Sequence, residues 1–217
     1  MYHDITIDSK GGPVLQASRG GPEGSTRGVV VFAHGSGSSR HSRRNRHVAD
    51  VLHDAGFTTL LLDLLTVDEE EVDLRTGEHR FDVEMLGERV VAAIDWLRLA
   101  ETAPIGLFGA STGAAAALIA AAGRPEDVSA VVSRGGRPDL AGEALPLVRA
   151  PTLLIVGGRD TTVIGMNTDA RSGMTVETSL EIVPGATHLF EEPGALEVVA
   201  DLTAAWFRHY LTPQSDP

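Results

Sequence analysis

The segment 106–117, GLFGASTGAAAA, constrains the fold more than any other part of the chain. A short apolar run, residues 104–108, leads into the pattern Gly-x-Ser-x-Gly, and an alanine-rich stretch follows it. This order predicts a strand, a sharp turn with Ser111 at its strained apex, and a helix. Gly109 and Gly113 flank the serine, because side chains at these positions would collide with the neighbouring strands and the helix.

Ser111 is a candidate nucleophile in this setting. The free N–H groups and the dipole at a helix N-terminus favour negative charge, and the N–H of Thr112 is placed to bind a developing oxyanion. The alternative is a glycine-rich turn in which Ser111 is an ordinary N-cap residue. The motif alone does not decide between the two, so the rest of the chain must supply a base and an acid.

Length and composition favour a single globular domain spanning 1–217, with 212–217 as a frayed tail. The net charge of −12 predicts repulsion from nucleic acid and from anionic membrane surfaces. The chain has no cysteine, which excludes disulfides, cysteine-metal sites and a cysteine nucleophile. The N-terminal residues show no secretory signal, and no apolar run is long enough to span a membrane, so we expect a cytoplasmic protein.

Strands and helices alternate along most of the chain, which predicts a mostly parallel sheet covered by helices on both faces. The acidic stretch 67–84 is expected to be an irregular surface loop, and its run 68–71 is interpreted as solvated, not as a metal site. The strands are predicted at 5–7, 14–17, 29–33, 58–62, 104–108, 128–132, 151–156 and 180–183, and the helices at 42–55, 85–99 and 195–211.

Candidate partners for Ser111 follow two later strands. A serine hydroxyl needs a base to take its proton, usually a histidine that a carboxylate orients. Asp160 follows the strand at 151–156, and His188 follows the strand at 180–183. Reactive groups of an open parallel sheet collect beyond the carboxyl ends of its strands, so we expect the three side chains to converge. The alternatives are that Asp160 caps a helix and that His188 only braces a loop.

The order Ser, Asp, His along the chain is that of the α/β-hydrolases. From about residue 29 to the terminal helix, the chain resembles this superfamily, and within it the dienelactone hydrolase-like branch. The resemblance implies an α/β-hydrolase fold. It rests on four motifs at strand ends: His34-Gly35-Ser36-Gly37, Gly109-Ala110-Ser111-Thr112-Gly113, Gly157-Gly158-Arg159-Asp160 and Gly185-Ala186-Thr187-His188-Leu189-Phe190.

The same resemblance implies further roles. The N–H of Ser36 becomes the second oxyanion donor, and His34 fixes the loop that carries it. Asp139 is a rival for the acid, since some family members carry the acid after the preceding strand. Dienelactone hydrolase itself uses cysteine, so Ser111 favours an ester or thioester substrate over a lactone. Some relatives are fused to a phosphoribosyltransferase domain, of which this sequence shows no diphosphate-binding acidic motif.

Two features bear on the substrate. About sixteen residues, 135–150, separate two strands after the elbow, which leaves no room there for a cap domain and favours small or short-chain acyl groups. Basic residues also cluster beside the oxyanion loop, and Arg134 is expected at the rim of the site. They are candidates to dock a carboxylate or phosphate; the alternative is solvated charge with ion pairs to the 67–84 stretch. The cluster comprises Arg40, His41, Arg43, Arg44 and Arg46.

The sequence therefore predicts a serine hydrolase that cleaves small-molecule carboxylic esters through an acyl-enzyme, with no cofactor and no metal. Its catalytic residues are Ser111, Asp160 and His188. The oxyanion donors are Ser36 and Thr112, and the candidate substrate-contacting residues are His34, Arg44 and Arg134. The alternatives are a thioesterase, an acyltransferase or a lactone hydrolase with the same triad, or a non-catalytic binding protein with this fold. The oligomeric state stays open.

Overall fold

A computed structural model describes residues 2–9 and 11–211, so the tail predicted at 212–217 lies outside the described residues. The strands are β1 (His3–Asp8), β2 (Val14–Gly20), β3 (Val29–Ala33), β4 (Thr58–Leu62), β5 (Ile105–Ala110), β6 (Val128–Arg134), β7 (Thr152–Gly157) and β8 (Thr178–Val183). They form one sheet in the order β1-β2-β4-β3-β5-β6-β7-β8. Strand β2 pairs antiparallel with β1 on one side and with β4 on the other. From β4 onward in this order, all neighbouring strands pair in parallel. The predicted, mostly parallel sheet is confirmed.

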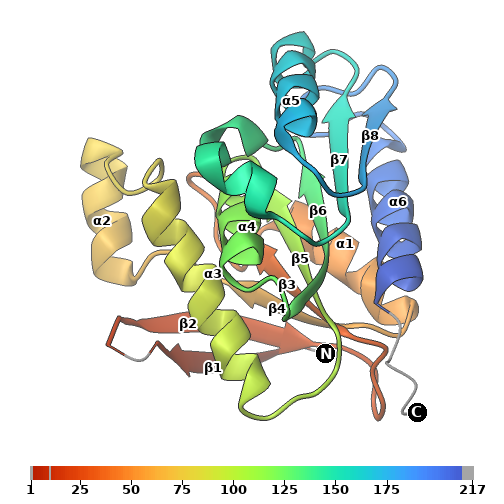
Figure 1. The fold of residues 1–217 in the computed structure, drawn as a ribbon. Helices are drawn as coiled ribbons and strands as arrows, with labels where there is room; N and C mark the ends of the chain where they lie inside the picture. The colour runs from red at the N-terminus through yellow and green to blue at the C-terminus, as the bar shows by residue number, and fades with distance from the viewer. Residues whose placement is uncertain (1, 10, 212–217) are drawn as a thin grey trace.

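Helices cover both faces of this sheet (Figure 1). One face carries α1 (Arg43–Asp54) and α6 (Ala195–Tyr210), which contact each other. The other face carries α3 (Val83–Arg98) and α4 (Thr112–Gly123), which also contact each other. Strands β3 to β7 are buried or nearly so along their whole length, as expected of parallel strands between two helical layers. Each face therefore has its own hydrophobic core.

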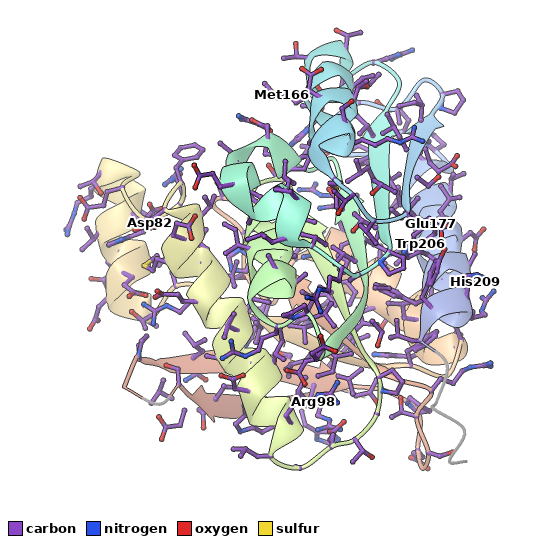
Figure 2. All side chains as sticks on the ribbon, viewed as in Figure 1. Asp82, Arg98, Met166, Glu177, Trp206 and His209 are labelled. Carbon is purple, nitrogen blue, oxygen red and sulfur yellow. The ribbon has the colours of Figure 1, made fainter. Side chains whose placement is uncertain are left out.

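The loop predicted over 67–84 is wrong, because α2 (Val67–Thr76) occupies most of it. Thr66 and Glu69 form a reciprocal capping box at its start, and Gly77 ends it in the left-handed conformation with φ 69°. The acidic residues of its first turn complement the helix dipole, which favours this helix. Asp82 then caps α3, and Arg98 lies at the far end of that helix (Figure 2).

Two further segments complete the chain. Helix α5 (Thr161–Gly173) lies between β7 and β8 and was not predicted from the sequence. The 3₁₀ segment η1 (Pro138–Leu147) joins β6 to β7 and lies within the stretch 135–150, which was predicted to be too short for a cap domain. Because only η1 lies between these strands, the described chain has no separate cap domain. Among the described residues, none of the helices combines the length and apolar character needed to cross a bilayer.

Candidate active site

The elbow at Ser111 joins β5 directly to α4. Ser111 has φ 52° and ψ −122°, which is a strained backbone conformation for a residue with a side chain. A Cβ on Gly113 would overlap the carbonyl oxygen of Ala33, and a Cβ on Gly109 would lie 2.6 Å from the carbonyl oxygen of Gly113. The predicted need for glycine on both sides of the serine is therefore confirmed. Close packing of the strands against the helix holds Ser111 in this conformation.

The loop after β3 lies against this elbow. A Cβ on Gly35 would approach the Cβ of Ser111 to 2.9 Å, so the two segments are in direct contact. The N–H of Ser36 donates to the hydroxyl oxygen of Thr112 at 3.1 Å, and the two side-chain hydroxyls lie 3.0 Å apart. The Ser36 N–H thus lies beside the nucleophile but is already bonded in this state. The N–H of Thr112 belongs to the first turn of α4, where backbone N–H groups have no partner within the helix.

His34 holds that loop through backbone contacts. Its Nε2 accepts the N–H of Leu64 at 3.0 Å, so the ring proton is on Nδ1, which lies 2.9 Å from the carbonyl oxygen of Gly35. Burial lowers the pKa of His34, because the charged imidazolium would lose its hydration. Both ring nitrogens are therefore committed to the neutral form. This arrangement suits a residue that positions the loop.

The candidate base and acid contact each other. Nδ1 of His188 lies 2.6 Å from Oδ2 of Asp160, and the carboxylate can only accept this hydrogen bond. Asp160 is also the N-cap residue of α5, but its side chain makes no capping bond. The carboxylate therefore serves the imidazole and not the helix. The two side chains come from loops after β7 and β8, as predicted from the sequence.

Ser111 lies close to this pair without a bond to it. The backbone N–H of Ser111 donates to the carbonyl oxygen of Arg134 at 3.2 Å. Gly135 follows Arg134 in the chain, and a Cβ on it would lie 3.5 Å from Nδ1 of His188. In the described part of the chain, the Ser111 hydroxyl makes no hydrogen bond, and the His188 ring makes only the one to Asp160. Catalytic hydrogen bonds are often long before substrate binds and shorten in the complex.

Asp139, the rival acid, has a different partner. Its carboxylate accepts two hydrogen bonds from Arg137, with Nη2 at 2.7 Å and Nε at 2.9 Å. It makes no bond to His188, which leaves Asp160 as the carboxylate on the imidazole.

In the described ranges, no group of three or more histidine and carboxylate side chains could hold a metal ion.

The basic cluster has partners that differ from those expected. Arg40 pairs with Asp63 and Asp4, and Arg44 pairs with Glu191 at 3.3 Å. None of the described ion pairs joins the cluster to the 67–84 stretch, so that expectation is wrong. Acidic residues of α2 pair elsewhere instead, for example Glu69 with Arg89. The cluster therefore lies on the start of α1 and the residues just before it, and its described ion pairs do not involve α2.

Arg134 is buried, although the sequence placed it at the rim. The residue is 8% exposed, and its Nε and Nη1 atoms are enclosed without a hydrogen-bond partner. Burial and, to a smaller extent, the positive charge of Arg44 together lower the pKa of Arg134 to about 10. The guanidinium remains charged at neutral pH. This buried cation is the feature of the site that sequence reasoning placed least well.

A small pocket opens beside the oxyanion loop. It is lined by residues of that loop and by apolar side chains that follow β4 or belong to α2 and α3, and charged residues also contribute. The apolar residues are Leu64, Leu65, Leu74 and Leu86, and the charged ones are Asp63, Glu70, Asp73 and Arg80. Ser36 and Thr112 also line it, so it adjoins the elbow. A larger hollow of about 610 Å³ lies between the β1–β2 turn and α3. Ser111, Asp160 and His188 line neither hollow, but the smaller pocket, unlike the larger one, is lined by the two candidate oxyanion donors.

Comparison with known proteins gives one family and a consistent set of structures. A sequence profile described as "Dienelactone hydrolase family" matches residues 15–210. The crystal structure of a dienelactone hydrolase from Anabaena variabilis is 56% identical, with a TM-score of 0.93 over 97% of this chain and 98% of that one. Est1E from Butyrivibrio proteoclasticus has a TM-score of 0.79 at 16% identity, covering 95% of this chain and 98% of that one, which is a likeness of fold.

Two curated relatives from Mycobacterium tuberculosis strains carry a different name. Each is called "Putative phosphoribosyl transferase" and is 54% identical over 211 residues. The match covers 96% of this chain and 47% of each relative. The chain therefore spans about half the length of these relatives, and their name describes a longer protein.

Proposed function

The chain belongs to the dienelactone hydrolase family, and we propose that it is a serine hydrolase acting on small or short-chain carboxylic esters through an acyl-enzyme. The observation that carries this proposal is the 2.6 Å contact between His188 and Asp160 beside the strained elbow at Ser111. A nucleophile, a base and an orienting carboxylate in this order form the minimal apparatus for acyl transfer. The family and the esterase-like fold neighbours support hydrolysis in general; the ester substrate and the serine mechanism are the proposal.

In the proposed reaction, Oγ of Ser111 attacks the ester carbonyl carbon while Nε2 of His188 takes the hydroxyl proton. Asp160 orients the imidazole and stabilises its positive charge. The tetrahedral intermediate collapses to the acyl-enzyme, and the leaving alcohol takes the proton back from His188. A water molecule, deprotonated by His188, then releases the acid. Protein groups alone carry these steps, so the proposal needs neither a cofactor nor a metal.

The proposed oxyanion hole consists of the N–H groups of Ser36 and Thr112. The Ser36 N–H is bonded to the Thr112 hydroxyl, so this hydroxyl must turn away, or share the donor, when a substrate oxygen enters. His34 keeps the loop in place during this exchange, because its two backbone contacts are independent of Thr112. The small apolar pocket next to these donors supports a short acyl chain.

We propose small-molecule esters as the partners of this chain. The mycobacterial name belongs to proteins of which the chain spans about half. A cytoplasmic location and the absence of nucleic-acid or membrane partners stay predictions from the acidic sequence. Thioester cleavage, acyl transfer, lactone opening and non-catalytic binding are separated from ester hydrolysis by the experiment below.

The test is steady-state hydrolysis of 4-nitrophenyl acetate and butyrate by wild type and Ser111→Ala. We expect kcat to fall by a factor of about 10³ or more, because the nucleophile is lost. Ser179→Ala is the matched control, since Ser179 lies at the amino end of β8, away from the loop that carries His188, and its hydroxyl bonds Glu181. Undiminished turnover by Ser111→Ala rejects the mechanism. Faster cleavage of acyl-CoA or lactones than of esters changes the substrate class.

A further inference from the structure

The segment 66–81, which contains α2 and the turn after it, lies outside both hydrophobic cores. No residue of α2 belongs to either described core cluster or packs against one. The one buried residue of this helix is a carboxylate, Asp73, and not an apolar side chain. Figure 1 shows α2 at the outer edge of the molecule, beyond α3. The packing of an apolar face, which stabilises most helices in proteins, therefore contributes little to holding α2 in place.

Polar bonds within the segment make it a unit of its own. Thr66 and Glu69 form the capping box at the start of α2. The Asp73 carboxylate accepts the backbone N–H groups of His79 and Arg80, each at 2.9 Å, and Nε of Arg80 at 2.8 Å. Nη2 of Arg80 also donates to the carbonyl oxygen of Asp73 at 2.8 Å. These bonds fasten the turn to the helix, so the segment can keep its shape when its contacts with the rest of the protein change.

Two side-chain contacts attach this unit to its surroundings. Glu69 pairs with Arg89 of α3 at 2.9 Å, and the hydroxyl of Ser36 lies 3.4 Å from the carbonyl oxygen of Arg80, which is long for such a bond. In the part of the chain that the structure describes, no other side-chain hydrogen bond or ion pair leaves 66–81. One ion pair and one long hydrogen bond hold a helix only weakly. Ser36 is also a candidate oxyanion donor, so the unit contacts the site itself.

The segment forms one wall of the small pocket beside the oxyanion loop. Leu74 and Arg80 line this pocket together with Leu64, Leu86 and Thr112. Its volume is about 30 Å³, which is close to the share of one water molecule in the liquid. The acyl groups of the proposed substrates are larger than this. The pocket must therefore widen to take one, and the weakly attached segment is the part of its wall that can move.

Leu74 lies at the mouth of this pocket. It is among the lining residues, yet it is 70% exposed. Two of the charged lining residues are already paired, Asp63 with Arg40 and Asp73 with Arg80. The surface that the pocket offers to a ligand is therefore mainly that of leucine side chains, which suits an alkyl chain.

We propose that the segment 66–81 is a lid that opens to admit the acyl chain of the substrate, and that Leu74 limits the length of this chain. The lid turns as one body about its two ends, because more bonds lie within it than attach it to the rest of the protein. It differs from a cap domain between β6 and β7, since it lies between β4 and α3. This inference rests on the proposed function and names the part of the site that selects the substrate.

Lid opening is tested first, without catalysis. The chain has no cysteine, so a single introduced cysteine reports the accessibility of its own position. Leu86→Cys places a thiol in the pocket under the lid, and Val90→Cys, on the same buried face of α3 but outside the pocket, is the matched control. We expect Leu86→Cys to react with dithiodipyridine at least about ten times faster than Val90→Cys, because a local opening is more frequent than unfolding. Equal rates overturn the lid.

The attachment of the lid is tested in the same way. Arg89→Met removes the ion pair to Glu69 and leaves the capping box in place. In the Leu86→Cys background, it is expected to speed the thiol reaction by a factor of about 2 to 5. Arg124→Met is the control, because it breaks an ion pair to Asp95, near the other end of α3. No acceleration, or the same acceleration by both changes, counts against the lid.

Acyl selection is tested next, with 4-nitrophenyl acetate, butyrate and hexanoate. Leu74→Trp is expected to narrow the mouth and lower kcat/KM for hexanoate, relative to acetate, by a factor of about 10. Leu74→Ala is expected to raise the same ratio by a factor of about 3. Leu99→Ala is the control, since Leu99 is equally exposed but lies at the far end of α3. The same ratio in wild type and all three variants overturns the role of Leu74.

The tests separate this inference from the proposed function. If wild type hydrolyses none of the three esters, the hydrolase assignment fails, while the thiol rates still decide whether the segment opens. If the esters react but the thiol rates are equal and the acyl preference does not change, the hydrolase stands and the lid is rejected. Should Leu86→Cys fail to fold, Leu64→Cys, also buried in the pocket lining, is compared with Leu62→Cys, which is buried outside it, by the same readout.

Discussion

Arginine side chains at the two ends of the parallel sheet differ in burial and in hydrogen bonding. At the amino ends of β5 and β6, Arg98 donates to the Asp127 carboxylate at 2.9 Å and to the carbonyl oxygen of Ala103 at 2.8 Å. At the carboxyl ends of the same strands, Arg134 is more deeply buried but has no partner for Nε or Nη1. Ser111, the next residue after β5, combines a strained backbone with an unbonded hydroxyl.

This contrast teaches where the chain departs from the rules of stable folding. Buried polar groups are normally paired, and non-glycine residues rarely adopt positive φ. Arg98 at the amino end follows the first rule, whereas at the carboxyl end Arg134 violates the first rule and Ser111 the second, and these two residues are joined by a backbone hydrogen bond. Local rules are most often broken at functional sites, where the surrounding structure compensates the cost. The carboxyl end is therefore the end to test for chemistry, and the amino end supplies the controls.

Asp160→Asn is expected to give the largest effect. Loss of the carboxylate leaves His188 without its orienting acceptor, and kcat for a neutral ester should fall by a factor of about 10⁴. Asp139→Asn is the control, because its carboxylate bonds Arg137 and not the imidazole. We expect it to retain kcat within a factor of about three. A larger loss in Asp139→Asn than in Asp160→Asn would reverse the assignment of the acid.

Gly113→Ala should be the most damaging substitution for stability. Its Cβ would overlap the carbonyl oxygens of Ala33 and His34, so the unfolding free energy is expected to fall by about 3 kcal/mol or more. Gly165→Ala is the control, since it lies exposed in α5 with open space around its Cβ. That change should stabilise by about 0.5–1 kcal/mol through helix propensity. Urea unfolding measures both, and equal effects would show that the elbow is not tightly packed.

Arg98→Met and Arg134→Met compare the two ends directly. Arg98→Met removes three hydrogen bonds at a half-buried site and should cost about 1–2 kcal/mol of unfolding free energy. Arg134→Met removes an unpaired buried charge and keeps an apolar stem of similar volume. We expect its unfolding free energy in anion-free buffer to be unchanged or higher by up to about 2 kcal/mol. A loss larger than that of Arg98→Met would mean that Arg134 has a structural partner.

The smallest expected effect is the pH dependence due to His34. Its pKa is lowered in the folded state, so the unfolded chain binds the extra proton first as pH falls. Stability should therefore be fully present above the ordinary histidine pKa of about 6.5 and decrease below it, by at most about 1.4 kcal/mol per pH unit for this one group. Urea unfolding of wild type and His34→Gln between about pH 7 and pH 5 measures this decrease. An equal slope in both proteins would assign it to other groups.

Much of this fold could be predicted because it follows from local patterns. Continuous apolar runs marked the central strands, and the two glycines around Ser111 marked the elbow. Helix α2 was missed although its signals are present: Thr66 with Glu69 is a capping box, and Gly77 ends the helix. Helix α5 is harder to see, because its buried face includes the polar Asn167, whose amide donates to the carbonyl oxygen of Gly136.

The candidate site was predictable in its residues but less so in its contacts. Ser111, Asp160 and His188 each follow a strand, so the topology of the sheet gathers them at one edge. The bond between the Ser36 N–H and the Thr112 hydroxyl depends on a side-chain rotamer, which no sequence pattern specifies. The burial of Arg134 depends on how α1 and the 188–191 loop pack over the end of β6. Tertiary packing of this kind is not encoded within one segment of the chain.

The most direct test of the account is covalent labelling with a fluorophosphonate, followed by peptide mass spectrometry. This reagent reacts with a serine hydroxyl only when a base activates it. The account predicts one adduct per chain, located on Ser111, with labelling strongly slowed in Asp160→Asn and unchanged in Asp139→Asn. Wild-type protein that stays unlabelled, or an adduct on another residue while Ser111 is unmodified, would contradict it.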